Sequence, residues 1–219
     1  MIEKYYNGVI EQVAGGIGNV EHNSILVRYS NDFSIWDLES VNHYKDQTDI
    51  FFTCHEFSYN KIAEAYEPYL GLIRQMFHKY CSGTLEEFME ECDVYKLQRP
   101  VFESYFEKGF CERTEQILID EVEYEQERMR NSIVTMLQKL SEIRPVVIVL
   151  NRFQLASKST MQLSNSLLQV KNKNIGIVLG VNDVQSIPEF AHEEWDAICE
   201  SMDDRNMVYH IGNAGRNME

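Results

Sequence analysis

Three neighbouring residues, Cys54, His55 and Glu56, have side chains that can act as a nucleophile, a base or metal ligands. They end a β-rich run, and the carboxyl end of a strand is where α/β sheets bind ligands. Successive side chains of a strand point to opposite faces, which argues against a Cys–His catalytic pair. A metal site needs three or four ligands at tight spacing, and the spacing around these residues fixes no such set.

The glycine-rich segment Gly15–Gly18 is a second candidate site, because glycine-rich loops can bind phosphates through their backbone N–H groups. It precedes the first expected strand instead of following it, and no Lys-Ser or Lys-Thr pair comes after it. We interpret it as a helix stop and a turn. The acidic cluster Glu121–Glu127 is interpreted as a solvated helix face.

The elements that must position these residues alternate between helical and strand patterns. Apolar residues at spacings of three and four predict helices over 1–14, 59–82, 112–142, 157–171 and 189–202. β-Rich runs predict strands at 24–29, 49–54, 145–151, 174–181 and 207–211. Asp32 or Ser34 is expected to cap a short helix that ends near Tyr44, and Thr84–Glu87 has the pattern of a capping box. This order predicts an α/β fold with a mostly parallel five-stranded sheet flanked by helices.

Composition excludes several classes of partner. The chain has 219 residues and a net charge of −15, which argues against nucleic acid or an anionic membrane as the main partner. No run approaches the ~20 apolar residues of a membrane span. Five widely spaced cysteines without a CxxC pair, and an N-terminus without a signal-peptide pattern, predict a cytoplasmic protein with reduced thiols.

The segment from Arg144 to Thr160 resembles the Walker B region of STAND-class P-loop ATPases, the AAA-related modules of bacterial signalling regulators. In that family a Pro and an apolar strand are followed by two acidic residues, an aromatic or Leu-Gln-x-Ala-Asp segment and a leucine-rich helix. Phe153–Ser157 and Ser159–Leu163 are similar to the later parts of this pattern.

Two further segments extend the resemblance. The strand that ends before Asn182 has the place of the family's sensor strand, and Tyr66–Ile73 resembles its helix after the second strand. The resemblance covers about residues 1–212. It implies one AAA/STAND-like domain with a three-layer P-loop NTPase-like fold and a helical insertion over 84–142.

The departures from the family decide the expected function. The family's first strand leads into GxxxxGK[ST], but the corresponding positions here are Ser30, Asn31, Asp32, Phe33 and Ser34. Without glycine the backbone does not readily form a phosphate nest, and Asp32 would repel a triphosphate. Phe33 and Trp36 are expected to fill the volume of the phosphates.

The resemblance also assigns roles to three later positions. Asn151 stands where the family has its metal-binding acid, and Arg152 stands where it has the acid that polarises water. Asparagine is a neutral, poor ligand for Mg²⁺. Asn182 is sensor-like in position, and without a phosphate we interpret it as a turn or helix cap.

The sequence therefore predicts a pseudo-ATPase with no catalytic residues, cofactor or metal. It would belong to a larger bacterial signal-transduction or transcription-regulatory protein and act through protein partners or that protein's other domains. Residues 213–219 are expected to be a polar tail, with the family's lid and winged-helix domains absent, as in an excised or truncated piece. One alternative is a divergent ATPase domain that binds ATP and Mg²⁺. A second is an unrelated α/β enzyme at Cys54–Glu56.

Overall fold

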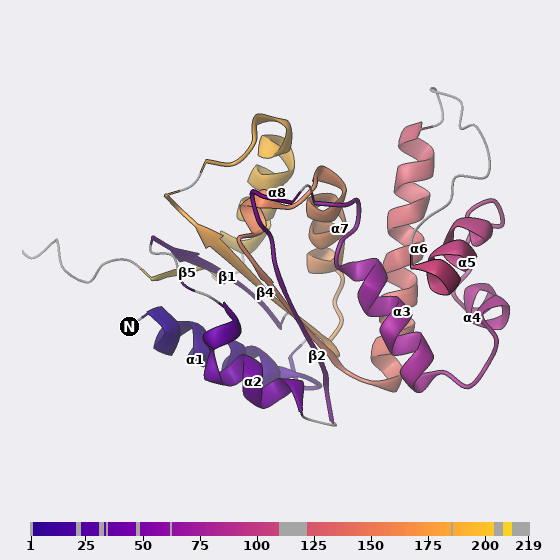
Figure 1. The fold of residues 1–219 in the computed structure, drawn as a ribbon, viewed down its shortest axis with the longest axis horizontal. Coiled ribbons are helices and arrows are strands. Elements are labelled where there is room, and N and C mark those ends of the chain that lie inside the picture. The colour runs from indigo at the N-terminus through magenta and orange to yellow at the C-terminus, as the bar shows by residue number, and fades with distance from the viewer. Residues whose placement is uncertain are drawn as a thin grey trace, which may run out of the picture. The chain divides into compact units, whose positions relative to one another are not determined.

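A computed structural model describes residues 2–20, 23–30, 33, 35–46, 49–61, 63–109, 122–184, 186–203 and 208–211. The chain forms two compact units (Figure 1). We call Met1–Glu67 with Arg144–Glu219 the α/β unit, and Pro68–Ile143 the helical unit. The helical insertion expected over 84–142 therefore begins earlier in the structure, at Pro68, and includes one more helix.

The α/β unit is built on a parallel sheet with the strand order β2-β3-β4-β1-β5. Its strands are β1 (Asn23–Tyr29), β2 (Phe51–Glu56), β3 (Val146–Asn151), β4 (Ile175–Asn182) and the shorter β5 (Val208–Ile211). Because all the pairings are parallel, the strands end at one edge, which we call the carboxyl edge. The expected α/β class, with a parallel sheet flanked by helices, is confirmed.

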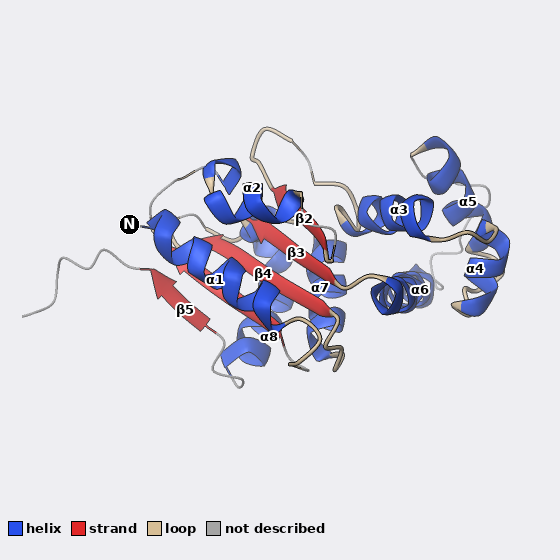
Figure 2. Cartoon of the chain, turned by 90° about the horizontal axis from the view of Figure 1, so that it is seen from below, coloured by secondary structure: helices blue, strands red, loops and turns tan. Residues whose placement is uncertain are grey.

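Helices cover both faces of this sheet (Figure 2). One face carries α1 (Ile2–Gly16) and α2 (Glu39–Lys45), and the other carries α7 (Lys158–Gln169) and α8 (His192–Asp203). The strand order explains this division, because parallel crossovers are right-handed. The connection from β1 to β2 runs across the sheet in one direction, and those from β3 to β4 and from β4 to β5 run in the other.

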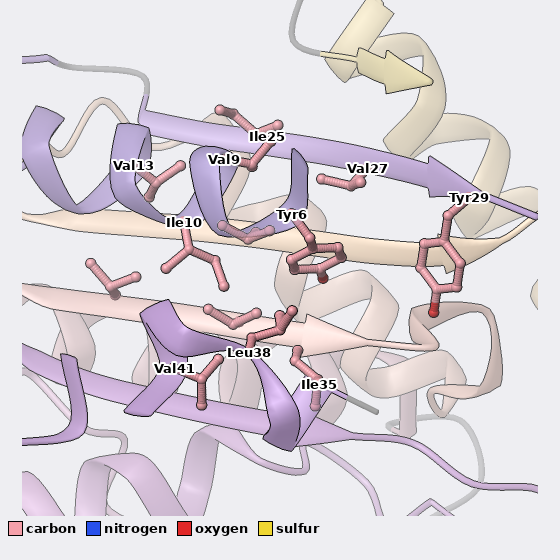
Figure 3. Packing of buried hydrophobic residues seen from close by; sticks show 13 residues of the cluster. Tyr6, Val9, Ile10, Val13, Ile25, Val27, Tyr29, Ile35, Leu38 and Val41 are labelled. Atoms are coloured by element: carbon pink, nitrogen blue, oxygen red, sulfur yellow. The ribbon is translucent and has the colours of Figure 1, made fainter. Parts of the chain in front are cut away.

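Helix α1 approaches the sheet closely because β4 presents glycine beneath it. A Cβ atom at Gly180 would lie 2.2 Å from the Tyr6 hydroxyl, and one at Gly176 would lie 2.6 Å from Val13 Cγ1. The apolar cluster on this face (Figure 3) consists of Tyr6, Val9, Ile10, Val13, Ile25, Val27, Tyr29, Ile35, Leu38, Val41, Val147, Val149 and Val178. Burial of these side chains is the main stabilising contribution to the interface between α1, α2 and the sheet.

The helical unit contains α3 (Tyr69–Tyr80), α4 (Leu85–Glu91), α5 (Arg99–Lys108) and α6 (Val122–Ile143). The ring of Phe77 lies 5.2 Å from that of Phe88 and 5.5 Å from that of Phe106, so one aromatic cluster joins α3, α4 and α5. The capping box expected at Thr84 and Glu87 is confirmed, with both reciprocal hydrogen bonds formed.

The single helix expected over 59–82 is wrong. Helix α3 begins only at Tyr69, and Pro68 occupies its N-cap position instead of kinking a longer helix. Tyr66 has a φ of 61°, in the left-handed region, which a continuous right-handed helix does not allow. Ile62, part of the predicted apolar face, lies outside the described residues.

Tertiary hydrogen bonds account for this early turn segment. The carbonyl of Glu64 accepts a hydrogen bond from Ser157 Oγ at 3.1 Å, and that of Glu67 accepts one from Thr160 Oγ1 at 3.0 Å. Both hydroxyls lie at the start of α7, so this helix end holds the segment after β2 in turns. Local periodicity does not reveal partners that are 93 residues away.

Other predicted boundaries shift at element ends. Helix α2 begins at Glu39, after Leu38, without a side-chain cap. Asp32 and Ser34, the two predicted caps, lie outside the described residues. The first part of the helix expected over 112–142 and the tail at 213–219 lie outside the described residues. In the described part of the chain, no helix is long and apolar enough to cross a membrane.

Candidate functional site

The carboxyl ends of β1 and β4 form a topological switch point. These strands are neighbours, but β1 continues to α2 on one face of the sheet and β4 continues to α8 on the other. Ligands of open α/β sheets bind outside the strand ends at such a point. The last residues of the two strands, Tyr29 and Asn182, lie side by side in the register. The side chains here therefore decide what this edge can bind.

Aromatic rings occupy one side of the switch point. Phe33, in the segment after β1, has its ring centre 5.3 Å from that of Tyr6 and 5.0 Å from that of Tyr29. Figure 3 shows the Tyr6 and Tyr29 rings near the carboxyl ends of the strands, with the Tyr29 hydroxyl directed toward the end of β3. Phe33 thus packs on two buried tyrosine rings at the end of β1.

The other residues that the sequence analysis compared with a phosphate loop have different surroundings. Ser30 is half-buried directly after β1, whereas Asn31, Asp32 and Ser34 lie outside the described residues. Trp36 was expected to fill the volume of the phosphates, but its side chain is 44% exposed. Its ring stacks under Lys45, whose Nζ lies 4.6 Å from the ring centre.

Asn151, the last residue of β3, is fully buried and joins three strands. Its Oδ1 accepts a hydrogen bond from the Tyr29 hydroxyl at 2.8 Å, and its Nδ2 donates to Glu56 Oε1 at 3.3 Å. The amide thus uses an acceptor toward β1 and a donor toward β2. A carboxylate at this position would lose the donor and would face the Glu56 carboxylate.

Arg152 neutralises the same acid. It has a φ of 52°, in the left-handed region, and its Nε lies 3.4 Å from Glu56 Oε1. Both side chains are mostly buried, with 25% of Arg152 and 15% of Glu56 exposed. The residue directly after β3 is therefore a cation paired with the last residue of β2. We call Tyr29, Asn151, Arg152 and Glu56 the edge network.

Asn182 uses its side chain within its own turn. Its Oδ1 accepts a hydrogen bond from the Val184 amide at 3.0 Å, and its backbone amide lies 3.3 Å from Gln154 Oε1. The next residue, Asp183, donates its backbone N–H to the Tyr29 carbonyl at 2.8 Å. These bonds fix the loop after β4 against the end of β1.

The trio at the end of β2 does not form one site. Cys54 packs against the apolar cluster under α1 and α2, and burial raises the pKa of its thiol to about 12. The ring of His55 instead lies 4.5 Å from that of Phe57, and its Nε2 lies 4.0 Å from Glu67 Oε1. Burial lowers the pKa of His55. A thiol held in its neutral form is a poor nucleophile, so this geometry does not favour an enzyme of the Cys–His type.

Tyr6 is a component of this region that the sequence analysis missed. The residue is fully buried, and its hydroxyl has no hydrogen-bond partner in the part of the chain that the structure describes. Burial, followed by the neighbouring Tyr29, raises the pKa of this hydroxyl well above its ordinary value. The sequence treats Tyr5 and Tyr6 alike, since only the packing of α1 on Gly180 tells which one points inward.

Metal ligands do not gather at this edge. Within the described ranges, no group of three or more His, Cys, Asp or Glu side chains lies close enough to hold a metal ion. The only acid of the edge network, Glu56, is engaged by Asn151 and Arg152. The edge network joins the ends of β1, β3 and β2 through a hydroxyl, an amide and an ion pair.

Comparison with known proteins adds no family assignment. The sequence matches no protein-family model and no curated protein.

Proposed function

We propose that the α/β unit is a catalytically inactive, P-loop-like module of the AAA/STAND type. It would serve a larger bacterial signal-transduction or transcription-regulatory protein through contacts with protein partners or with that protein's other domains. The strand order supports this proposal. It sets β4 between β1 and β3, so the loops after these three strands meet at one edge. A P-loop ATPase needs its phosphate loop, sensor and Walker B residues in this arrangement.

The hydrogen bond between Tyr29 and Asn151 is the observation that carries the proposal. It joins the last residues of β1 and β3, with both groups buried, and under this proposal these residues would lie beside the phosphate loop and at the place of the metal-binding acid. Phe33 packs on Tyr29 at the same place. An ATP-binding edge would need a lysine, an Mg²⁺-binding carboxylate and backbone N–H groups facing solvent here.

Electrostatics support the same conclusion. Phosphoryl transfer depends on cationic groups and Mg²⁺ that neutralise the charge of the phosphates. Arg152, the cation of the edge network, is already paired with Glu56. With a net charge of −15, the chain also lacks a general attraction for polyanions, which supports a protein partner over nucleic acid.

Calorimetric titration with ATP and ADP, each with and without Mg²⁺, tests this proposal. We expect no binding heat at millimolar nucleotide, because Arg152 is paired with Glu56 and the described residues hold no cluster of metal ligands for Mg²⁺. Thermal unfolding with and without nucleotide is the parallel measurement, since a ligand that binds only the folded state raises the Tm. A Kd below about 100 μM, or roughly 5.5 kcal/mol of binding free energy, would refute the proposal and favour a divergent ATPase domain.

A further inference from the structure

The side of β2 that faces away from β3, which we call its outer edge, carries a row of backbone groups that no other strand in the described part of the chain pairs. In the strand order β2-β3-β4-β1-β5, β2 is the outermost strand on its side of the sheet (Figure 2). Among the described strands it pairs only with β3. All the residues of β2 are half-buried, whereas all those of β3 are buried, and this difference is typical of an edge strand.

The hydrogen bonds to β3 show which groups of β2 point outward. The backbone N–H groups of Phe51 and Phe57 donate to carbonyls at the two ends of β3, at 2.7 and 3.0 Å. Because alternate residues of a parallel strand bond to the same neighbour, the N–H and C=O groups of Phe52 and Cys54 point away from β3. Among the described residues these outward groups have no hydrogen-bond partner.

The outer edge of β2 lacks the features that keep natural edge strands apart. Such strands are commonly protected by lysine, proline, a bulge or a very short length. The sequence of β2 is FFTCHE, and its residues pair with β3 in continuous register. Its only carboxylate, that of Glu56, lies 3.4 Å from Nε of Arg152. The row of backbone groups is therefore suited to pairing with another strand.

The spacing of the outward groups is self-complementary. If Cys54 lies opposite Cys54 of a second copy in an antiparallel pair, Phe52 lies opposite Glu56 of that copy. Each of these pairs then exchanges both backbone hydrogen bonds, so the outward groups on both strands are satisfied. The two Glu56 carboxylates lie four residue steps apart, roughly 13 Å along the strands, and salt screens their repulsion at that distance.

We propose that the chain forms a two-fold dimer in which the outer edges of β2 pair antiparallel and join the two sheets into one. A two-fold contact closes on itself, whereas pairing of β2 with β5 of another copy would continue into an open filament. The side chains of Phe52 and Cys54 already pack against the apolar cluster under α1 and α2, so backbone hydrogen bonds are the main contacts of the dimer. The carboxyl edges of the two copies would point in opposite directions. The proposal does not depend on whether the α/β unit binds nucleotide.

Sedimentation equilibrium of the full chain from about 1 to 300 μM measures the self-association. Amide hydrogen exchange, read residue by residue by NMR over the same concentrations, locates it on the chain. We expect a monomer–dimer equilibrium in which the N–H groups of Phe52 and Cys54 exchange at least about tenfold more slowly in the dimer. The N–H groups of Thr53 and His55 are the internal control, because they point toward β3 and should exchange slowly in both states.

A charge placed on the outer edge tests the pairing from the other side. Thr53→Lys adds a lysine beside Cys54, at the centre of the paired edges, and should weaken dimerisation about tenfold or more. Thr135→Lys, at an exposed position of α6, is the matched control and should leave the dimer unchanged. Thermal unfolding shows whether both variants keep the fold. The exchange measurement on the unaltered chain does not depend on the folding of either variant.

The outcomes separate the occupants of this edge. Dimerisation with protection of Phe52 and Cys54 that Thr53→Lys weakens would support the proposal. A monomer at every concentration would overturn it and leave an extended segment of another protein as the partner. A dimer in which these two amides stay unprotected would also overturn it. Slow exchange of the two amides in the dilute monomer would do the same, because the outer edge would then be covered within one copy.

Discussion

Tyrosines have opposite roles in the two units of this protein. At the carboxyl edge of the α/β unit, Tyr6 and Tyr29 are no more than 1% exposed, and the Tyr29 hydroxyl is bonded to Asn151. On the helical unit, Tyr95 and Tyr124 are 40% and 66% exposed. The carboxyl edge of the α/β unit thus buries its tyrosines, while the helical unit leaves Tyr95 and Tyr124 exposed to solvent. Substitutions of the same type should therefore have different effects in the two regions.

The largest difference in stability is expected between alanine substitutions at two glycines. In each case the new Cβ atom would lie near a tyrosine hydroxyl. Gly180→Ala should destabilise the protein by about 3 kcal/mol, because the Cβ would lie 2.2 Å from Tyr6 Oη. Gly71→Ala is the control in α3, where the nearest atom, Tyr105 Oη, is 3.6 Å away, and it should stabilise by up to about 1 kcal/mol. Urea unfolding measures both. Adding Tyr6→Phe to Gly180→Ala should restore part of the loss, and similar effects at both glycines would remove the distinction.

A smaller difference is expected when an amide is changed to an acid. Asn151→Asp should cost about 2 kcal/mol at pH 7, since it removes the donor to Glu56 and places two carboxylates together. The pKa of the new acid would be raised in the folded state, so the loss should shrink as the pH falls and the acid is protonated. Asn131→Asp, at an exposed position of α6, should change stability by less than about 0.5 kcal/mol. The measurement is urea unfolding between pH 5 and 8, and a loss independent of pH would contradict the buried acid pair.

Removal of one hydroxyl should also have different effects on the stability of the two units. Tyr29→Phe should cost about 1 kcal/mol, because it leaves one acceptor of the buried Asn151 amide without its donor. Tyr124→Phe should have almost no effect on the free energy of unfolding, since water replaces any bond of an exposed hydroxyl. Thermal and urea unfolding of the two variants provide the test. Equal stability changes would show that the edge network contributes nothing specific.

The smallest effect concerns the pH dependence at the end of β2. Burial lowers the pKa of His55 in the folded protein, so the unfolded chain binds the proton more readily. This contribution to stability is present above the unfolded pKa of about 6.5 and is lost as the pH falls through the lower folded pKa. Lys61 also lowers the pKa of Glu67. The stability that Glu67 contributes is lost only at more acidic pH, below the ordinary Glu pKa of 4.5. His55→Gln should therefore flatten the stability curve between pH 7 and about 5. An unchanged slope in that window would exclude His55 as its source.

Much of the α/β unit was predictable because its signals are local. The apolar runs of β3 and β4 and the periodic stripe of α1 indicate buried strands and a covering helix without reference to other residues. The strand predicted at 145–151 likewise ends at Asn151, with Arg152 directly after it. Their roles were not predictable, because the network is formed by residues far apart in sequence. Tyr29 and Asn151 are separated by 122 residues, and Asn151 and Glu56 by 95.

The turn before α3 shows the same limit from the opposite side. Apolar spacing favoured a helix through Tyr66, but the backbone carbonyls of Glu64 and Glu67 have partners at the start of α7. Pro68 was visible in the sequence, and its fixed φ without an N–H donor suits a helix start better than a helix interior. The proline therefore indicates that the helix begins at Tyr69. The left-handed Tyr66 had no such signal.

The two glycines of β4 beneath α1 also bear on how the protein is made. About 160 residues separate the end of α1 from Gly176, so a ribosome adding 5–20 residues per second needs about 10–30 s to bridge them. During that interval the apolar stripe of α1 has β1 available but lacks β4, one of the strands against which it finally packs. We expect nascent chains that end before β4 to expose this stripe to chaperones and to aggregate more readily than chains that end after it.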